Sequence, residues 1–521
     1  MGNTAAYRPE TLEEATASLE ELDREIAELT RERDLYKSLS EQLATQIKLK
    51  NRKLFAPTSE ATDQLQLFNE AEALSDASAV EPEIEQITYR RKKQVGKREA
   101  DLSKFERVRI DYELDAHEQI CPACESDLHD MGVDIRSELT IVPARICVTE
   151  HAAHKYACRT CQVHNTSTPI VKANSPAPII EKSIASPSLV SHIIASKYTL
   201  ALPLYRQEAD WRAKGIDIPC QNMANWILRA ADWAQPIYQQ MKADLLAHEV
   251  IHADETVMQV LREPGKKAAA KSYIWLYRSG GDCAHPLILY DWKKSRSLGC
   301  LKEFLGSYCG YIHADGYDAY HKLEGATIVG CMAHVRRKFA DALSVLDEKA
   351  RLDSEAAKGL AYCNALFDLE RQWAGLEPDK RFKERTEKSK PLFDEFILWA
   401  QNVRALPKSP LGKAIAYLLN QKPYLENVYL DGRLELSNNR AERSIKPFVI
   451  GRKNWLFANS VKGARASATL YSIVESAKEN DLNVFEYLTY LFEQLPNTTT
   501  DHIADLCPHS GNLPERLYVT K

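Results

Sequence analysis

The sequence predicts a multidomain α+β protein, and three observations support this prediction. Residues 10–50 repeat hydrophobic positions at heptad spacing, residues 105–165 hold short β-like segments around two cysteine pairs, and residues 249–331 contain strands followed by alternating strands and helices. With 521 residues and 44% hydrophobic content, the chain is long enough for about three or four domains. We therefore expect an N-terminal helix, a cysteine-rich domain, a helical domain and a mixed α/β core.

The N-terminal helix is predicted by hydrophobic residues at every seventh position. Leu12, Leu19 and Ile26 form one such series, and a second apolar series accompanies it with Glu and Arg between the two. This pattern favours a short coiled coil within residues 1–68, and hence a homo-oligomer. An intramolecular helical hairpin is the alternative.

Charge is unevenly distributed along the chain. Residues 1–89 hold 9 Lys and Arg against 19 Asp and Glu, a net charge of −10, whereas the remaining residues hold 59 against 54, a net charge of +5. An acidic linker and a basic segment are expected over 69–104, and 433–465 carries eight basic residues against two acidic ones. Such a local positive excess suits contact with a phosphate backbone, although a solvated helix face would look similar.

Hydrophobic segments that would cross a membrane are missing from the sequence. No run reaches about 18 apolar residues, the length that a membrane-spanning helix needs, and the N-terminus does not resemble a signal peptide. We therefore expect a cytoplasmic protein with no membrane partner. In that compartment the 12 cysteines are expected to be thiols or metal ligands rather than disulfides.

Two Cys-x-x-Cys pairs lie in the predicted domain at 105–170. Cys121 and Cys124 form the first pair, and Cys158 and Cys161 form the second. Four thiolates in this pattern can close a tetrahedral Zn²⁺ site, although the 33 residues between the pairs exceed the usual spacing of about 15–20. Because four thiolates leave no open coordination position, we expect a structural zinc. Free thiols are the alternative.

A helical domain is predicted over 171–248. Helices at Leu202–Ala213 and Gln221–Ala231 flank a break at Lys214-Gly215. This arrangement suits a DNA-binding helix-turn-helix, but two ordinary core helices would give the same pattern.

The α/β core is predicted from three strand-like segments, which are followed by strands alternating with helices. The first three are Glu249–Leu261, Ser272–Arg278 and Pro286–Tyr290, separated by turn residues. This order describes a mixed α/β domain. The expected parts are the first part of the core at 249–345, a helical insertion at 346–430, the second part of the core at 431–495 and a C-terminal tail at 496–521.

Three acidic residues in this core are candidates for catalysis. Asp254 and Asp315 follow strand-like segments in similar contexts, and Glu442 lies 127 residues after Asp315 in a basic segment. A carboxylate at a strand end projects into an open cleft, and three carboxylates suit a pair of Mg²⁺ ions acting at phosphorus. The alternatives are turn formation by the aspartates, and a capping box or an i,i+4 pair for Glu442.

A Cys-x-x-His pair follows the last predicted strand. Cys331 and His334 are followed at once by Arg336, Arg337 and Lys338. The histidine is a candidate for positioning a phosphate or a water, and the basic residues are candidates for backbone contacts. A core cysteine and a structural histidine are the alternative.

Five motifs occur in order along the chain. They are HADET (His252–Thr256), DGYDAY (Asp315–Tyr320), CMAHVRRKF (Cys331–Phe339), NNRAERSIKPFVIGRKNWLF (Asn438–Phe457) and YSIVESAKEN (Tyr471–Asn480). In these motifs the chain resembles the DDE-type transposases of insertion-sequence family 66 over nearly its whole length. The resemblance implies an RNase H-like catalytic core with Asp254, Asp315 and Glu442 as its triad, a helical insertion before the third acid, and a zinc-finger-like domain for recognising element ends.

The resemblance also implies what such a protein does. It would bind the ends of a mobile element, cleave DNA strands and transfer them, using two catalytic Mg²⁺ ions that Mn²⁺ can replace. Its partners would be double-stranded DNA of the element ends and target, and small accessory proteins encoded by the same element, in a nucleoid-associated cytoplasmic location. The residues expected to contact phosphate or DNA are His334, Arg336, Arg337, Asn438, Arg440, Arg443, Arg452 and Lys453.

One position departs from the family pattern. The family usually has an acidic residue just before the paired asparagines, and this chain has Ser437. Because Glu442 itself matches, we interpret Ser437 as a changed helix cap, with Glu435 as a substitute ligand in the alternative case. Two other functions stay open: a nuclease on the same fold, and a zinc-containing DNA-binding regulator with an inactive core, which Ser437 would favour.

Overall fold

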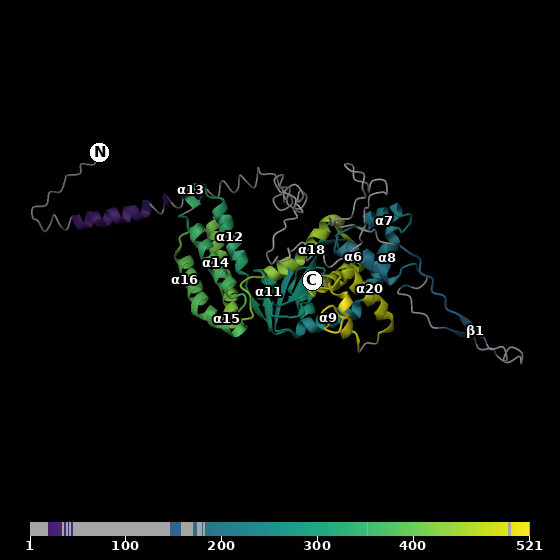
Figure 1. Ribbon diagram of the computed structural model, residues 1–521. Coiled ribbons are helices and arrows are strands. Elements are labelled where there is room, and N and C mark those ends of the chain that lie inside the picture. Colours follow the sequence, from purple (N-terminus) through teal and green to yellow (C-terminus); the bar gives the residue numbers. More distant parts are fainter. Residues whose placement is uncertain are drawn as a thin grey trace, which may run out of the picture. The chain divides into compact units, whose positions relative to one another are not determined.

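The computed structural model describes most of the chain from residue 183 onward and shorter segments before it (Figure 1). Two compact units are formed, one by residues 1–56 and 177–519 and the other by residues 57–176 with 520–521. The described residues are 19–33, 36–37, 40, 43–44, 146–157, 170–173, 180, 183–351, 353–498 and 502–519. The predicted segment at 69–104 lies outside them, as do the four cysteines of the predicted zinc site, Cys121, Cys124, Cys158 and Cys161.

The N-terminal segment is helical over residues 19–33, in agreement with the predicted helix. Its apolar side chains Leu19, Leu22, Ile26 and Leu29 are between 52% and 61% exposed. An exposed apolar stripe at this spacing is what one helix of a coiled coil presents to its partner. Self-association through the stripe stays a prediction.

The second unit contains a two-stranded antiparallel ladder. β1 (Lys155–Ala157) pairs with β2 (Ile170–Lys172), and Tyr156 lies opposite Val171. These strands enclose the second predicted cysteine pair in the sequence. They agree with the short β segments expected in this region.

Four helices occupy residues 187–247, within the segment predicted to be helical. The first is capped by the Ser186 hydroxyl, which accepts a hydrogen bond from the Leu189 amide, and a proline directly precedes the second and the third. Gly215, with a φ of +82°, follows the second helix in a left-handed conformation that glycine adopts without strain. The predicted helices on either side of this break are confirmed as α7 and α8. The bounds are α6 Pro187–Tyr198, α7 Leu204–Ala213, α8 Cys220–Trp233 and α9 Gln235–Ala247.

A mixed sheet follows the four helices. Its first three strands form an antiparallel meander, and two later strands join in parallel on the other side of β3, which gives the order β5-β4-β3-β6-β7. A further short strand, β8, pairs with the far end of β3. The bounds are β3 Val250–Arg262, β4 Lys271–Ser279, β5 Ile288–Lys293, α10 Leu298–Leu305, β6 Tyr311–His313, α11 Asp318–His321, β7 Thr327–Val329 and β8 Ala458–Ser460.

Three later helices cover this sheet and the opening helices. α18 packs on β3 and β4, and α19 packs on β5, so that the rings of Phe448 and Tyr471 meet with centroids 5.3 Å apart inside the main hydrophobic core. Residues 502–519 also join this core, with Cys507 and Leu517 fully buried, so the described part of the expected C-terminal tail is packed rather than loose. The bounds are α18 Asn439–Trp455, α19 Val461–Glu479 and α20 Val484–Gln494.

Two serines of α19 form hydrogen bonds with the backbone of β5 at the edge of the sheet. β5 is the edge strand, and an edge strand leaves backbone groups without a partner. The Ser476 hydroxyl accepts from the Ile288 amide at 2.8 Å and donates to the Ile288 carbonyl at 2.9 Å. Ser472, one turn earlier, accepts from the Tyr290 amide at 2.8 Å. The serines of the YSIVESAKEN motif therefore dock this helix on the sheet edge.

A second hydrophobic cluster holds the helical block between β7 and α18. α12, α14 and α16 run side by side in Figure 1, and their buried side chains include Phe339, Leu366 and Phe396. α12, which the sequence groups with the first part of the core, packs against α14 and α17 instead. The bounds are α12 Met332–Ser344, α13 Glu348–Arg351, α14 Glu355–Gln372, α15 Pro378–Glu384, a π-helical turn Arg385–Ser389, α16 Lys390–Asn402, α17 Pro410–Leu425 and a 3₁₀ turn Glu426–Leu430.

A buried arginine links this block to the segment that leads into α18. Arg385 is 1% exposed and pairs with Glu370 through two bonds of 2.6 and 2.7 Å. It also donates to the carbonyls of Val428, Asp431 and Leu434. Because a buried charge is stable only when it is paired and hydrogen-bonded, Arg385 fixes the path of the chain just before the α18 motif.

The docking of α19 can be tested with Ser476→Ala. This change leaves the buried amide and carbonyl of Ile288 without a partner, so we expect the free energy of unfolding to fall by about 1–3 kcal/mol. The exposed Ser344 is the matched control, and its change to Ala should cost less than about 0.5 kcal/mol. Equal effects of the two changes in denaturant unfolding would contradict this role for Ser476.

Candidate active site

Asp254 lies in the middle of β3, and the expectation that it ends a strand is wrong. β3 continues to Arg262 because β4 remains paired with it along one side. On the other side, however, the parallel partner β6 separates from β3 after the His252–His313 pair. Among the described residues, that side of β3 then has no strand partner until Val260, which pairs with Ala458 of β8. This opening beside β3 replaces the expected strand end.

Asp315 follows the end of β6, as predicted. Its Oδ1 accepts a hydrogen bond from the Tyr317 amide at 3.0 Å, which holds the carboxylate in the turn. A Cβ on the intervening Gly316 would lie 2.7 Å from the hydroxyl oxygen of Tyr417 on α17. Glycine at this position therefore lets the helical block approach Asp315 closely. The Asp315 side chain is 28% exposed.

Glu442 lies in the first turn of α18, also as predicted. Its carboxylate is 26% exposed, and one oxygen is 3.3 Å from a guanidinium nitrogen of Arg337. The N-cap of α18 is Asn438, without a side-chain capping bond, so Ser437 is not the helix cap that the sequence suggested. The carboxylate of Glu435 pairs with Arg440 at 2.8 Å, and its role as a substitute ligand stays an alternative.

Asp254 is the candidate acid whose charge is most disfavoured by its surroundings. Burial, and after it the negative charges of Glu255, Asp315 and Glu442, together raise the pKa of Asp254 to about 8. The three carboxylates do not form one tight group, since the only trio of His, Cys, Asp or Glu ligand atoms within 4.8 Å that we find among the described residues is that of Cys331, His334 and Glu442. A loose acidic cluster of this kind, with a carboxyl group whose charge is disfavoured, suits a divalent cation.

The side chain of Asn438 joins the start of α18 to β3. Its Oδ1 is 3.0 Å from Nδ1 of His252, and its Nδ2 donates to the Ala253 carbonyl at 2.8 Å. The ring of His252 in turn stacks on that of His313, with centroids 4.3 Å apart. Burial lowers the pKa of both histidines, that of His252 to about 3, so both rings are neutral. These contacts set the third acid beside the strands that carry the other two.

Asn438 is therefore not available for the DNA contact that the sequence suggested. It is 1% exposed, and its amide is already engaged in two hydrogen bonds. Its backbone amide also donates to the Cys331 sulfur at 3.2 Å. The physical reason is that the helix start must dock on a buried strand, which takes up the polar groups of the first asparagine. Asn439 is the exposed one of the pair.

An ion-pair network that sequence reasoning missed supports the aspartates. Glu255, next to Asp254, has a side chain only 1% exposed and pairs with Arg296. It also accepts a hydrogen bond from the Tyr320 hydroxyl at 2.6 Å. Arg296 lies 3.9 Å from Asp315 and stacks on the ring of Tyr317 at 3.6 Å. The only sequence signal was that Glu255, Tyr317 and Tyr320 belong to the HADET and DGYDAY motifs.

The other predicted DNA contacts differ in exposure. Arg336, Arg337, Arg443 and Lys453 are exposed, whereas Arg440 is half-buried in its pair with Glu435. Arg336 also donates to Asn364 at 2.7 Å.

Arg452 contacts the sheet rather than an open surface. Its guanidinium donates to the Thr256 hydroxyl at 3.1 Å and to the Val257 carbonyl, both on β3. This helps to fix the C-terminal half of α18 on the strand that carries Asp254. A DNA contact by Arg452 would need these bonds to be shared or broken.

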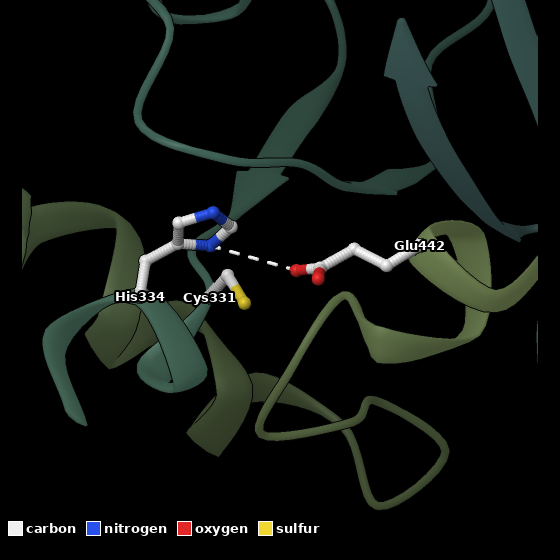
Figure 2. Close-up of side chains that lie close together, drawn as sticks. All are labelled: Cys331, His334 and Glu442. Carbon is white, nitrogen blue, oxygen red and sulfur yellow. Dashed lines mark ion pairs between the residues drawn. The ribbon is translucent and has the colours of Figure 1, made fainter. Parts of the chain in front are cut away.

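The Cys-x-x-His pair faces the third acid, as Figure 2 shows. His334 is 25% exposed, and its Nδ1 lies 3.8 Å from Oε1 of Glu442. Cys331 is 3% exposed at the N-cap of α12. Burial lowers the pKa of His334, while the charge of Glu442 raises it. The histidine is thus placed beside the predicted site, and its contact with phosphate or water stays a prediction.

Fold and site together define a mixed α/β protein with an acidic cluster beside exposed arginines. A model of the transposase IS66 family matches residues 182–466, and the chain belongs to this family, whose members are DDE-type transposases. The zinc-finger binding domain of transposase IS66 matches residues 118–162, the IS66 C-terminal element matches residues 472–509, and the model described as transposase C of IS166 homeodomain matches residues 42–110. The match to the zinc-finger binding domain, at residues 118–162, spans all four cysteines of the predicted zinc site.

The chain is also similar to three uncharacterized proteins of Sinorhizobium fredii (strain NBRC 101917 / NGR234). It is 31% identical to y4qI over 75% of this chain and 72% of that protein. It is 28% identical to y4jD over 77% of this chain and 80% of that protein, and 28% identical to y4hP over 74% and 72%. Among the described residues, no helix is long and apolar enough to span a membrane.

The neighbouring asparagines give a test of the Asn438 anchor. Asn438→Ala removes the bonds to His252 and Ala253, so we expect the free energy of unfolding to fall by about 1–3 kcal/mol. Asn439→Ala is the control and should change it by less than about 0.5 kcal/mol. If Asn438 were a surface contact for phosphate, both changes would leave the stability of the free protein unaltered.

A pH dependence follows from the raised pKa of Asp254. In the folded protein this pKa is about 8, against 3.8 ordinarily, so the carboxyl destabilises the fold increasingly as the pH rises from about 4 to about 8. Asp254→Asn removes the buried charge. Without divalent cations, we expect the variant to melt at a higher temperature than the parent at pH 8.5, and the difference to shrink toward pH 5.

The same melting temperatures can be measured after Mg²⁺ is added. Mg²⁺ should raise the melting temperature of the parent at pH 8.5 and raise that of Asp254→Asn much less. A difference between parent and variant that does not change with pH would contradict the burial of the Asp254 charge.

Proposed function

We propose that this member of the family binds the ends of a bacterial insertion sequence, cuts DNA strands there and joins them to a target. The observation that carries the proposal is that three acids lying 61 and 127 residues apart in sequence come from segments that meet at β3, through its pairing with β6 and through the bond from Asn438 to the Ala253 carbonyl. They come from a central strand, from the turn after its parallel neighbour and from the first turn of a packed helix. These acids, Asp254, Asp315 and Glu442, are the proposed catalytic triad.

The strand order supports an RNase H-like core. An antiparallel meander of three strands, with two strands added in parallel beside the first, is the order expected of that fold. Residues 249–345 and 431–495 are the proposed halves of the core, and 346–430 is the proposed insertion between the second and third acids. Most of the helical block lies within this insertion, whereas its first helix, α12, precedes it.

The acidic cluster fits the two Mg²⁺ ions that the family implies. Oε1 of Glu442 is buried without a hydrogen-bond partner, and the charge on Asp254 is disfavoured by burial and by neighbouring carboxylates. Oxygen ligands of this kind are those that Mg²⁺ prefers, and Mn²⁺ accepts them as well. Asp254, Asp315 and Glu442 would hold the ions, which when bound activate an attacking oxygen and stabilise a leaving one at phosphorus.

The chain's own residues would position the DNA around these acids. Arg337 is 58% exposed and 3.3 Å from Glu442, so its guanidinium can approach a phosphate without leaving the site. Arg336, Arg443 and Lys453 would add exposed positive charge, and His334 would orient a phosphate or a water. Arg440 and Arg452 would act mainly by holding α18 in place.

The remaining parts would deliver the ends of the element. We propose a structural Zn²⁺ held by Cys121, Cys124, Cys158 and Cys161 in the zinc-finger domain, and further end binding by α7 and α8. The exposed stripe of the N-terminal helix would join copies of the chain into a homo-oligomer. Small accessory proteins of the same element and a nucleoid-associated location are expectations from the family.

Strand joining distinguishes this function from that of a nuclease. Purified protein is incubated with Mg²⁺, a precleaved element end and a second duplex, and joined products are measured. We expect the parent to join the end, and Asp254→Asn to give no nicking or joining while binding the end with nearly unchanged affinity. Asp318→Asn, which removes an exposed acid three residues after Asp315, is the control and should keep activity.

Nicking without joining would favour the nuclease, and binding without nicking by the parent would favour the regulator.

A separate measurement tests the basic surface. Lys453→Gln should lower the salt dependence of the affinity by about one unit of slope, as expected for one lost phosphate contact.

A further inference from the structure

Cys331, His334 and Glu442 form a group that the proposed Mg²⁺ chemistry does not explain. One ligand atom from each lies within 4.8 Å of the other two, and the three side chains converge in Figure 2. Cys331 and His334 are three residues apart at the start of α12, so they share one face of that helix. Glu442 reaches them from the first turn of α18. The fold thus brings sulfur, nitrogen and oxygen ligands together from two helices.

Two of these atoms are buried and lack hydrogen bonds. Nδ1 of His334 and Oε1 of Glu442 have no hydrogen-bond partner, and at 3.8 Å they are too far apart to bond to each other well. Leaving buried polar atoms unpaired costs free energy, and a cation between them would remove that cost. The Cys331 sulfur accepts a hydrogen bond from the Asn438 amide at 3.2 Å, which suits a thiolate.

The chemistry of the three ligands selects a particular class of metal. Zn²⁺ binds thiolate, imidazole and carboxylate at about 2.0–2.3 Å, which places tetrahedral ligand atoms about 3.3–3.8 Å apart. The separations here need only a small closure to reach that geometry. Mg²⁺ avoids sulfur and nitrogen ligands, so it would not compete for Cys331 and His334.

We propose that Cys331, His334 and Glu442 form a site for Zn²⁺, or for Co²⁺ as its spectroscopic substitute, with one open position. On binding, the Cys331 thiol loses its proton to solvent and the thiolate enters the metal shell. Glu442 is then a zinc ligand and is not available to a Mg²⁺ ion held by Asp254 and Asp315. Zinc at this site therefore inhibits the Mg²⁺-dependent reaction. The inhibition rests on the proposed function, whereas the binding of zinc does not.

A second cysteine–histidine contact provides a matched control. Cys283 lies 3.7 Å from Nε2 of His248, at the beginning of the sheet. This pair does not belong to a trio of ligand atoms within 4.8 Å in the part of the chain that the structure describes. Cys283→Ser therefore removes a thiol from a comparable contact without touching the proposed site.

Metal binding is measured first, on the full-length protein. The parent, Cys331→Ser, His334→Gln and Cys283→Ser are dialysed against Zn²⁺, and bound metal is counted. Zinc held by the zinc-finger domain contributes equally to the parent and to every variant, so it drops out when their counts are compared. Loss of an outer-shell partner costs about 10–100-fold in metal affinity, and loss of a direct ligand should cost more. We therefore expect Cys331→Ser and His334→Gln each to bind one equivalent less than the parent, and Cys283→Ser to bind as much as the parent.

Co²⁺ identifies the ligand that changes. The thiolate-to-cobalt absorption band should be weaker in Cys331→Ser than in the parent and unaltered in Cys283→Ser. Melting curves confirm that each variant is folded, and two independent ligand changes keep the test valid if one variant is not. Equal zinc counts in the parent and in both ligand variants, or a loss confined to Cys283→Ser, would overturn the site.

Inhibition is measured second, as nicking in Mg²⁺ with increasing Zn²⁺, each variant being compared with its own zinc-free rate. We expect zinc to inhibit the parent and Cys283→Ser at concentrations that leave Cys331→Ser active. Inhibition of all three at the same zinc concentration would overturn the regulatory role. If the parent does not nick at all in Mg²⁺, the proposed function fails, while the zinc counts still decide the site.

Discussion

The arrangement of the site depends on the contact between the Asn438 side chain and β3. This asparagine uses its amide on His252 and on the Ala253 carbonyl, and so ties the first turn of α18 to the strand of Asp254. The stacked ring of His313 extends the contact to the strand that leads to Asp315. Because both histidines are buried and neutral, they connect α18, β3 and β6 without adding charge next to the acidic cluster. The acids themselves are held in place by neighbours rather than by one another.

Opposing charges around the acids explain why the cluster tolerates its own repulsion. Arg296 lies between Glu255 and Asp315, and Arg337 lies beside Glu442, so each outer carboxylate has a cation nearby. Asp254 accepts a hydrogen bond from the Glu255 amide at 2.8 Å, and burial raises its pKa. Glu442 stands between two sets of groups, the aspartates on the sheet and the Cys-x-x-His pair on α12. The choice of metal would decide which set it joins.

The sequence predicted the elements better than it predicted the contacts. Hydrophobic periodicity and turn residues located the strands, the insertion helices and α18, and motif order located Asp254, Asp315 and Glu442. Exposure cannot be read from residue type. The sequence therefore predicts DNA contacts for Asn438, which is buried, and for Arg452, which contacts β3. The Arg296 network was missed because Arg296 lies 41 residues after Glu255, and no local pattern announces such a long-range pair.

The central claim is that three distant acids form one metal centre. It is tested most directly by crystals of the protein soaked in Mn²⁺, in which anomalous scattering locates the metal independently of the protein atoms. We predict peaks within coordination distance of Asp254, Asp315 and Glu442, with at least one ion touching both aspartates. Manganese bound elsewhere, or bound to one of these carboxylates while the other two face away from it, would contradict the account.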